Sequence, residues 1–275
     1  MAEEFREIVV PTKDELDLFV RINNVQTPDA VVVLVHGLAE HSGRYEHVVN
    51  FFNRLNYSVY RFDLRGHGNS GGEKGYVEDF HQYIDDADCV VRLAQKENPG
   101  VPIFMLGHSM GGFITTAYGV RHPDKLQGQI LSGAAVILQP SMEPLKETDF
   151  DAMAHQTIPN SLSDQISRDR DVVDAYNQDP LVLKEFQFKL VGEVFLKGAQ
   201  WLMAHMPQYR YPCLILHGGC DEIVTHDASK WMHHHIGSQD KSLNIYESLY
   251  HEILNEPEME MVLSDIHAWI SKRLV

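Results

Sequence analysis

The fold is decided by the stretch Gly107-His108-Ser109-Met110-Gly111-Gly112, which has the spacing G-x-S-x-G. Residues 101–106 before it form a short apolar run typical of a buried parallel strand, and residues 113–121 after it are expected to form a helix. A serine on so tight a turn has strained backbone angles, and the glycine two positions away on each side leaves room where strand and helix cross. The turn presents the Ser109 hydroxyl at the carboxyl end of a sheet. We therefore predict a nucleophilic serine rather than a glycine-rich turn that happens to contain one.

The composition is that of a globular protein with a sizeable core. The chain has 275 residues, of which 44% are hydrophobic and 23% are charged, and this length fits one domain or two. Its formal net charge of -16 disfavours nucleic acid and strongly anionic membranes as partners, because like charges repel. A solubility preference of the host explains the same acidity equally well, so the charge assigns no function.

The cysteines and the N-terminal segment indicate the cellular compartment in which the protein is expected to reside. The three cysteines, Cys89, Cys213 and Cys220, are odd in number and lack C-x-x-C spacing, so we expect a reducing compartment, no disulfide framework and no zinc site. The N-terminal Met-Ala-Glu-Glu-Phe-Arg-Glu carries acids where a signal peptide needs positive charge, and no apolar run reaches about 18 residues. These features predict a cytoplasmic protein that does not span a membrane and contacts membranes only peripherally.

Strands and helices alternate along most of the chain. Residues 6–22 suggest an opening antiparallel hairpin around a turn at 11–15, and Val31–Val35 is so uniformly apolar that it belongs inside a sheet covered on both faces. Further strands are expected at 58–63, 128–132, 213–217 and 242–247, and helices at 44–56, 78–97, 226–236 and 257–273. This alternation predicts an α/β fold with a mostly parallel, doubly wound sheet.

The alternation is interrupted in the middle of the chain. No strand is expected from about 137 to 208, where a mixed, polar segment is followed by a helical stretch over 181–206 rich in Leu, Phe, Val and Met. We interpret residues 137–208 as a cap inserted between two parts of the core, 1–136 and 209–275. Most of its apolar side chains are expected to pack against the core, and a few to contact lipid.

Two conspicuous motifs predict no cofactor or metal. The glycine-rich loop 65–72 follows a strand, but its spacing is neither that of a dinucleotide-binding loop nor that of a P-loop, so it is interpreted as a structural turn. The run His233-His234-His235 falls on a predicted helix, where successive side chains point about 100° apart and cannot converge on one metal ion.

A nucleophilic serine needs a base within hydrogen-bond reach, and the base needs an orienting acid. Asp221 lies in a tight loop at the carboxyl end of the strand 213–217, with Glu222 beside it as the alternative acid. The loop after the strand 128–132 offers no acid before Glu143. The order along the chain of such sites is serine, acid, histidine, which favours Asp221 as the orienting acid.

The base is predicted to be His251, which follows the end of the strand 242–247. An imidazole with an ordinary pKa near 6.5 suits proton transfer at neutral pH. His217, inside a strand end, and His267, inside the last helix, are expected to be structural. The oxyanion of the reaction needs two backbone N–H donors, and their expected positions are Met110, after the nucleophile, and Leu38, in the loop after the early strand.

Several stretches outside the serine turn carry a resemblance to one family. They are His36-Gly37-Leu38-Ala39-Glu40-His41-Ser42-Gly43-Arg44-Tyr45, Tyr176-Asn177-Gln178-Asp179-Pro180-Leu181, and the segment from Ser238 to Lys241 with Tyr246-Glu247 and Tyr250-His251. Together with G-H-S-M-G-G at 107–112, they are similar to the motifs of the monoacylglycerol (monoglyceride) lipases and their lysophospholipase-like relatives among the α/β-hydrolases. The resemblance covers almost the whole chain and is weakest over about 137–165.

The resemblance implies an α/β-hydrolase fold with an inserted cap and the same site. Its catalytic triad carries over to Ser109, Asp221 and His251, and its oxyanion donors carry over to Leu38 and Met110. It also implies an ion pair of Glu40 with Arg44 near the glycerol-binding end, and Tyr176 in the same pocket. One position departs from the pattern, since Leu254 stands where some members have a second histidine, so the polar contacts to glycerol are expected to differ.

The function that these residues predict is hydrolysis of monoacylglycerol to glycerol and a free fatty acid through an acyl-serine intermediate. A lysophospholipase or a broad-specificity carboxylesterase uses the same machinery, and a non-catalytic hydrolase-like binding protein would lack a triad member, although none is missing here. The expected partner is monoacylglycerol or another small lipid ester, with transient contact of the cap with a membrane surface and no nucleic acid. Acyl-chain length, positional preference and oligomeric state are left open.

Overall fold

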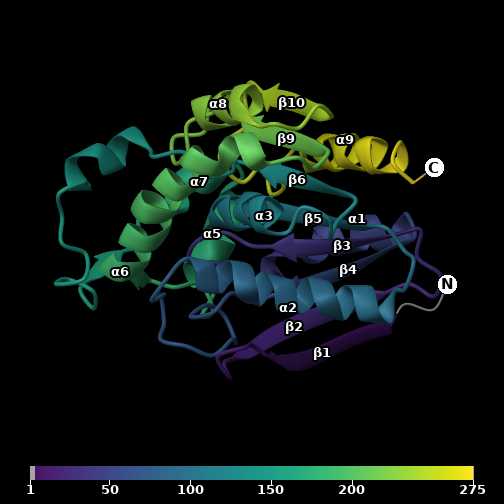
Figure 1. Cartoon of the computed structure of the whole chain (residues 1–275), viewed down its shortest axis with the longest axis horizontal. Helices are drawn as coiled ribbons and strands as arrows, with labels where there is room; N and C mark the ends of the chain where they lie inside the picture. Colours follow the sequence, from purple (N-terminus) through teal and green to yellow (C-terminus); the bar gives the residue numbers. More distant parts are fainter. Residues whose placement is uncertain (1–3, 275) are drawn as a thin grey trace.

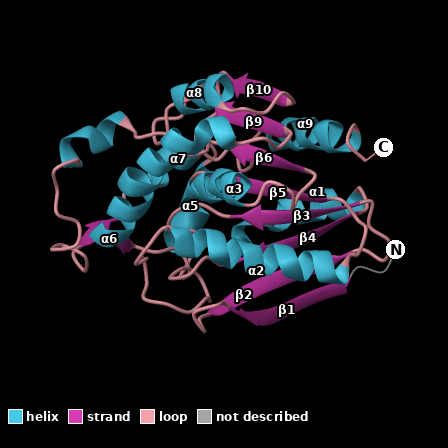
Figure 2. Ribbon diagram, viewed as in Figure 1, coloured by secondary structure: helices cyan, strands magenta, loops and turns pink. Residues whose placement is uncertain are grey.

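The computed structural model describes residues 4–274. Residues 1–3, at the start of the N-terminal segment discussed above, and residue 275 lie outside the described part. An eight-stranded sheet in the order β1-β2-β4-β3-β5-β6-β9-β10 forms the centre of the molecule, with helices on both of its faces (Figures 1 and 2). The strands are β1 (Glu4–Pro11), β2 (Asp17–Asn24), β3 (Ala30–Val35), β4 (Tyr57–Phe62), β5 (Ile103–His108), β6 (Gly128–Ser132), β9 (Cys213–Gly218) and β10 (Lys241–Tyr246).

The predicted α/β fold with a mostly parallel sheet is confirmed. β1 and β2 pair as an antiparallel hairpin, β2 pairs antiparallel with β4, and the other neighbouring strands are parallel. The strand from Ala30 to Val35 lies inside the sheet and is fully buried, as its unbroken apolar run predicts.

Helices cover the two faces of the sheet and divide the core into two layers. The α-helices outside the segment between β6 and β9 are α1 (Glu46–Arg54), α2 (His81–Glu97), α3 (Met110–Arg121), α8 (Asp227–His235) and α9 (Met259–Ser271). Because side chains alternate along a strand, Val31 and Val33 join the layer that contains residues of α2, α3 and α8, whereas Val32 and Leu34 join the layer of α1 and α9.

The segment between β6 and β9 lies beyond the ends toward which the parallel strands point (Figure 1, left). Its elements are η2 (Pro140–Leu145), β7 (Thr157–Pro159), α4 (Ser163–Ile166), α5 (Arg170–Gln178), β8 (Glu185–Gln187), α6 (Phe188–Val191), the π-helical η3 (Gly192–Gly198), α7 (Ala199–His205) and η4 (Met206–Gln208). The expectation that this segment contains no strand is wrong, because β7 and β8 form a small antiparallel sheet. Each strand has only three residues, too few for an alternating pattern to be visible.

The apolar side chains of this segment are mostly buried. Leu190, Val194, Leu202 and Met206 belong to the main core. A separate apolar cluster combines Met142, Phe150, Phe186, Val191 and Leu196 with Ala39 of the loop after β3, and Leu38 packs against it. This cluster, which we call the cap cluster, therefore adjoins the loop that carries a candidate oxyanion donor.

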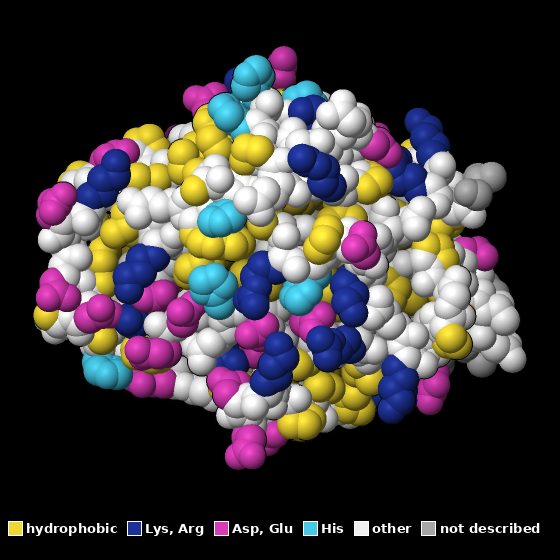
Figure 3. All heavy atoms as spheres, viewed as in Figure 1, with side chains coloured by type: hydrophobic (Ala, Val, Ile, Leu, Met, Phe, Trp, Pro, Cys, Tyr) yellow, Lys and Arg dark blue, Asp and Glu magenta, His cyan; other side chains and the backbone are white. Residues whose placement is uncertain are grey.

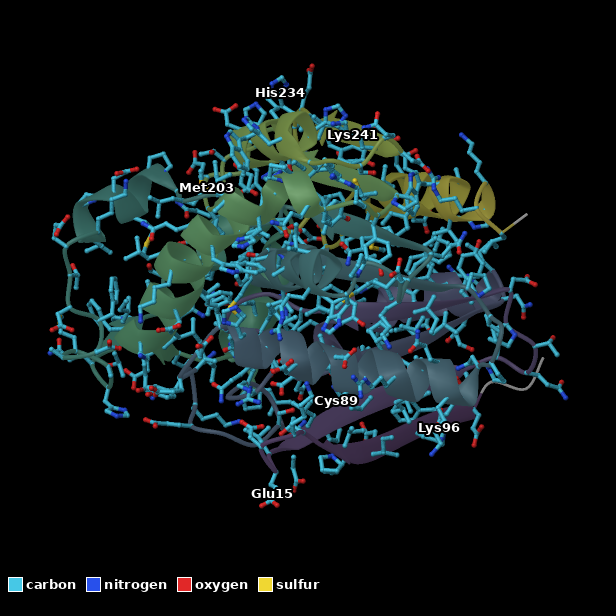
Figure 4. The ribbon with its side chains drawn as sticks, viewed as in Figure 1. Glu15, Cys89, Lys96, Met203, His234 and Lys241 are labelled. Atoms are coloured by element: carbon cyan, nitrogen blue, oxygen red, sulfur yellow. The ribbon has the colours of Figure 1, made fainter. Side chains whose placement is uncertain are left out.

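The surface carries charges of both signs. On the face drawn in Figure 3, acidic side chains are frequent on the left, over the segment between β6 and β9. The run His233-His234-His235 lies at the end of α8, with His234 at the outer edge of the molecule (Figure 4). Among residues 4–274, no helix has the length and apolar character needed to cross a membrane.

Candidate active site

Ser109 occupies the turn between β5 and α3 in a conformation that few non-glycine residues adopt. Its φ is 55° and its ψ is -117°. Backbone hydrogen bonds hold the turn from both directions, since the Ser109 amide donates to the Ser132 carbonyl at 2.9 Å and the Ala135 amide donates to the Ser109 carbonyl at 3.2 Å. Tertiary contacts thus stabilise the strained backbone that the G-x-S-x-G spacing predicts.

The glycines on either side of Ser109 are required by close packing. A Cβ atom on Gly107 would lie 2.3 Å from the carbonyl oxygen of Gly111, and one on Gly111 would lie 2.2 Å from the carbonyl oxygen of Val35. Backbone atoms cannot move aside as a flexible side chain can. These two positions therefore admit no larger residue without displacing β3, β5 or α3.

Asp221 is the acid that the fold brings to His251. The Asp221 Oδ2 atom lies 2.6 Å from Nδ1 of His251, and its Oδ1 atom accepts hydrogen bonds at 2.9 Å from the amides of Ile223 and Val224. Both side chains are buried. Glu222 is exposed, and its Oε2 atom accepts a long hydrogen bond, of 3.4 Å, from Gln165. Of the two acids that the sequence leaves open, Asp221 alone contacts the histidine.

Electrostatics keep Asp221 ionised and make His251 a stronger base. Burial raises the pKa of Asp221, but the charge of His251 and the hydrogen bonds from His217 and His251 outweigh burial and hold that pKa well below its ordinary value. Burial lowers the pKa of His251, whereas the charge and hydrogen bond of Asp221 raise it, and the net result is a raised pKa. Asp221 therefore stays ionised and stabilises an imidazolium at His251.

His251 also lies close to the serine turn. Its ring packs on His108, the residue before Ser109, with the ring centroids 4.7 Å apart. Burial lowers the pKa of His108 to about 4, and the neighbouring His251 adds to this effect, so His108 is neutral at pH 7. Because Nδ1 of His251 bonds to Asp221, Nε2 is the atom that remains for proton transfer.

The loop after β3 runs directly beside Ser109. A Cβ atom on Gly37 would lie 3.1 Å from Cβ of Ser109. The Gly37 amide donates to Oε1 of Glu40 at 2.6 Å, which holds the loop in place. Among residues 4–274, no group accepts a hydrogen bond from the amide of Leu38 or of Met110. Both candidate oxyanion donors are thus unengaged, and Met110 begins α3, where the helix dipole favours an anion.

Glu40 and Arg44 form the expected ion pair, and a third residue joins them. Nη1 of Arg44 lies 2.8 Å from Oε2 of Glu40 and 2.6 Å from Oε1 of Glu252, and Nη2 lies 2.8 Å from Oε2 of Glu252. The Tyr45 hydroxyl donates to the other oxygen of Glu40 at 2.7 Å. The Arg44 guanidinium also lies over the ring of Tyr176, 4.8 Å from its centroid.

The stretch 176–181 and the residues just after it are connected to the loop after β3. Asp179 Oδ2 lies 2.8 Å from Nε2 of His41, and the Leu183 amide donates to the Ala39 carbonyl at 2.8 Å. The hydroxyl of Tyr176 accepts a hydrogen bond from Asn160 at 2.7 Å, and burial raises the pKa of this phenol to about 12. Two sequence motifs more than a hundred residues apart thus form one side of the site.

Sequence reasoning missed two residues of this site. His217, expected to be structural, has its Nε2 atom 3.0 Å from Oδ2 of Asp221. Its position four residues before Asp221, at the end of the same strand, is the signal that was available. Glu252 is hard to identify from the sequence, because its contact with Arg44 depends on how two distant loops meet. Its place directly after His251 was the only signal in the sequence.

Known proteins resemble this chain over most of its length. A family model described as serine aminopeptidase, S33, matches residues 26–258. The monoacylglycerol lipase of Mycolicibacterium smegmatis is 35% identical over 261 residues, which cover 92% of this chain and 93% of that protein. The monoglyceride lipase of Homo sapiens is 34% identical, over 90% of this chain and 84% of that protein. The crystal structure of the monoacylglycerol lipase of Paleococcus ferrophilus superposes with a TM-score of 0.81 at 27% identity, covering 98% of this chain and 99% of that one.

Proposed function

The chain belongs to the monoacylglycerol lipase-like serine hydrolases of the α/β-hydrolase fold, and we propose that it hydrolyses monoacylglycerol to glycerol and a free fatty acid. The observation that carries the proposal is the buried pair of Asp221 and His251, joined at 2.6 Å, beside a serine held at φ 55°. A nucleophile on a strained turn and a base oriented by a carboxylate are the parts that acyl transfer needs.

In the proposed first half-reaction, Oγ of Ser109 attacks the ester carbonyl carbon while Nε2 of His251 accepts the hydroxyl proton. The carbonyl oxygen becomes an oxyanion, which the amides of Leu38 and Met110 stabilise by hydrogen bonds. When the tetrahedral intermediate collapses, the bond to the glycerol oxygen breaks and His251 donates its proton to that oxygen. Glycerol leaves, and the acyl group remains as an ester on Ser109.

In the second half-reaction, His251 accepts a proton from a water molecule as that water attacks the acyl carbon. The same two amides stabilise the second oxyanion. The bond between the acyl carbon and Oγ then breaks, His251 returns the proton to Ser109, and the fatty acid is released. Asp221 remains ionised throughout and stabilises the imidazolium that forms in each half.

The two ends of the site support a lipid ester with a small polar alcohol. Glu40, Arg44 and Tyr176 form a buried polar group on the side of Ser109 reached by the loop after β3. The cap cluster supplies apolar side chains against Leu38 and Ala39. We propose that residues 137–208 act as the cap, that glycerol binds near the polar group and that the acyl chain lies against the cap cluster.

A lysophospholipase is the alternative with the same machinery, and one observation disfavours it. A phosphate group needs compensating positive charge, yet the guanidinium of Arg44 already bonds to Glu40 and Glu252. Purified protein incubated in parallel with monoolein, oleoyl lysophosphatidylcholine and p-nitrophenyl esters tests the proposal. We expect kcat/KM for monoolein to exceed that for the lysophospholipid by at least about tenfold, or about 1.4 kcal/mol. Equal rates on the two lipids would favour a broad-specificity carboxylesterase.

A further inference from the structure

Two carboxylates share a single guanidinium immediately beside the candidate base. Glu252, the residue after His251, places both oxygens on Arg44, and Glu40 places one oxygen on the same Nη1 atom. The exposed fractions of the side chains are 9% for Arg44, 2% for Glu40 and 5% for Glu252. We call these three residues the acidic triplet, because two carboxylates against one cation leave a net negative charge that water screens poorly.

The acidic triplet lies close to Ser109, the candidate nucleophile. A single methyl group placed on Gly37 would lie 2.9 Å from Oε1 of Glu40 and 3.1 Å from Cβ of Ser109. The carboxylate of Glu40 and the side chain of Ser109 are therefore separated by about the width of one methyl group. The leaving alcohol of an ester bound with its alcohol at the Glu40 end of the site is close enough to be affected by the net negative charge of the acidic triplet.

The surroundings of the acidic triplet add more negative charge. A cavity of about 540 Å³ opens beside Arg44, and its lining includes the carboxylates of Asp169, Asp179 and Glu256. Arg44 is the one arginine or lysine in that lining. Nε2 of His41 lies 2.8 Å from Oδ2 of Asp179, and Arg168 forms an ion pair with Glu256 that partly compensates the charge of that carboxylate. None of these groups provides a free cation for an anionic alcohol.

We propose that Glu252 restricts the site to esters of uncharged alcohols and excludes esters whose alcohol carries a phosphate monoester. If Arg44 were paired with Glu40 alone, the two charges would cancel. The second carboxylate makes the acidic triplet negative, so a doubly charged phosphate on the leaving alcohol is repelled before and during the reaction. This inference rests on the proposed function, because it assumes that the leaving alcohol lies at the Glu40 end.

The same charge acts on the base. The titratable groups around His251 are Asp221, Glu252, Glu40 and His108, and Arg44 pairs with both glutamates. Glu252 and Glu40 stabilise the imidazolium and so contribute to the raised pKa of His251. Removal of the Glu252 charge must therefore lower that pKa. Activity that requires neutral His251 then persists to lower pH.

The native protein gives the first test. We compare 1-oleoylglycerol with 1-oleoylglycerol 3-phosphate, presented in the same neutral detergent micelles. We expect kcat/KM for the uncharged ester to be at least about a hundredfold higher, equivalent to about 2.7 kcal/mol. Similar values for the two esters would overturn the proposal.

Glu252→Gln tests the residue itself, since glutamine keeps the shape and one acceptor for Arg44 but removes the charge. We expect the preference for the uncharged ester to fall by about tenfold or more. We also expect the acid limb of kcat/KM, measured with p-nitrophenyl butyrate, to move to lower pH. Glu247→Gln is the matched control, because Glu247 is exposed and lies four residues before His251. It should leave both measurements unchanged.

A purely structural role would give another pattern. If Glu252→Gln lowered the rates on all esters equally and left the acid limb in place, the proposal would be wrong. Glu40→Gln removes a charge from the other side of the acidic triplet, and it should weaken the preference in the same direction if Glu252→Gln does not fold. A preference that Glu40→Gln left unchanged would also overturn the proposal.

Failure of the proposed function is recognised separately, because the protein would then hydrolyse p-nitrophenyl butyrate but not 1-oleoylglycerol.

Discussion

Nε2 of His217 lies 3.0 Å from Oδ2 of Asp221, the same oxygen that accepts the hydrogen bond from His251. Nε2 of His217 also lies 2.8 Å from the Val224 carbonyl, and its Nδ1 lies 2.7 Å from the Ser229 hydroxyl. A carbonyl oxygen can only accept, so Nε2 carries the proton and Nδ1 accepts from Ser229. His217 thus fixes the carboxylate that orients the base.

The first prediction concerns this positioning role. His217→Phe keeps a flat ring but removes the donor, and we expect kcat/KM to fall by about tenfold to a hundredfold, as for the loss of one hydrogen bond to a charged group. His217→Gln places an amide nitrogen near the position of Nε2 and should retain most of the activity. Steady-state kinetics on p-nitrophenyl butyrate compare the two variants. Equal losses in both would show that packing, not the hydrogen bond, is what matters at this position.

The second prediction concerns the nucleophile. Ser109→Ala should abolish ester hydrolysis while the protein remains folded, because no other group supplies the attacking oxygen. The expected loss in kcat is on the order of 10⁴-fold to 10⁶-fold. A fluorophosphonate probe should label the native protein and not the variant, and circular dichroism should be the same for both. Labelling that persisted in Ser109→Ala would assign the nucleophile to another residue.

The third prediction separates two neighbouring acids. Asp221→Asn keeps the shape but removes the charge that stabilises the imidazolium, so activity should fall by several orders of magnitude. Glu222→Gln should be nearly silent, because Glu222 is exposed and does not contact His251. The two variants are assayed side by side on one ester. Reversed effects would move the orienting acid by one position.

Local pattern was enough to predict the sheet and the candidate residues. Val31–Val35 is apolar at every position, and only a central strand buried on both faces accommodates such a run. Ser109, Asp221 and His251 each follow a strand, and the carboxyl ends of parallel strands meet at one edge of the sheet. The contact of Asp221 with His251 agrees with that reasoning, whereas the catalytic roles remain predictions.

Features that depend on distant contacts could not be predicted in the same way. β7 and β8 exist because Thr157 meets Gln187 across 30 residues of chain, and neither strand has a pattern of its own. The contact of Glu252 with Arg44 joins residues 208 positions apart. It depends on the loop after β10 reaching the loop after β3, and the one signal in the sequence is that Glu252 directly follows His251.

The fourth prediction concerns stability in acid. Burial raises the pKa of Glu252, but the charge and hydrogen bonds of Arg44 outweigh it and lower the pKa to about 2. A carboxylate whose pKa is depressed in the folded state stabilises the fold above its ordinary pKa of 4.5, and this contribution is lost as the pH falls toward about 2. The free energy of unfolding should therefore be higher for the native protein than for Glu252→Gln at pH 6, and the difference should shrink at pH 3.

Urea unfolding of both proteins at the two pH values checks this prediction. Glu247→Gln serves as the control, because its exposed carboxylate has no ion pair among the residues that the structure describes. It should follow the native protein at both pH values. A difference between the native protein and Glu252→Gln that stayed constant from pH 6 to pH 3 would contradict the prediction.

The last prediction concerns the acyl chain. Leu196 belongs to the cap cluster, which also contains Ala39 and contacts Leu38 of the proposed oxyanion loop. If the acyl chain lies along this cluster, Leu196→Ala should lower kcat/KM for dodecanoyl and oleoyl esters more than for acetate or butyrate, since each buried methylene contributes roughly 0.8 kcal/mol. Met261→Ala removes an apolar side chain that is 50% exposed on α9, and it should change no substrate preference. A series of p-nitrophenyl esters from acetate to dodecanoate gives the measurement. A loss that was the same for every chain length would mean that Leu196 supports the fold and that the acyl chain binds elsewhere.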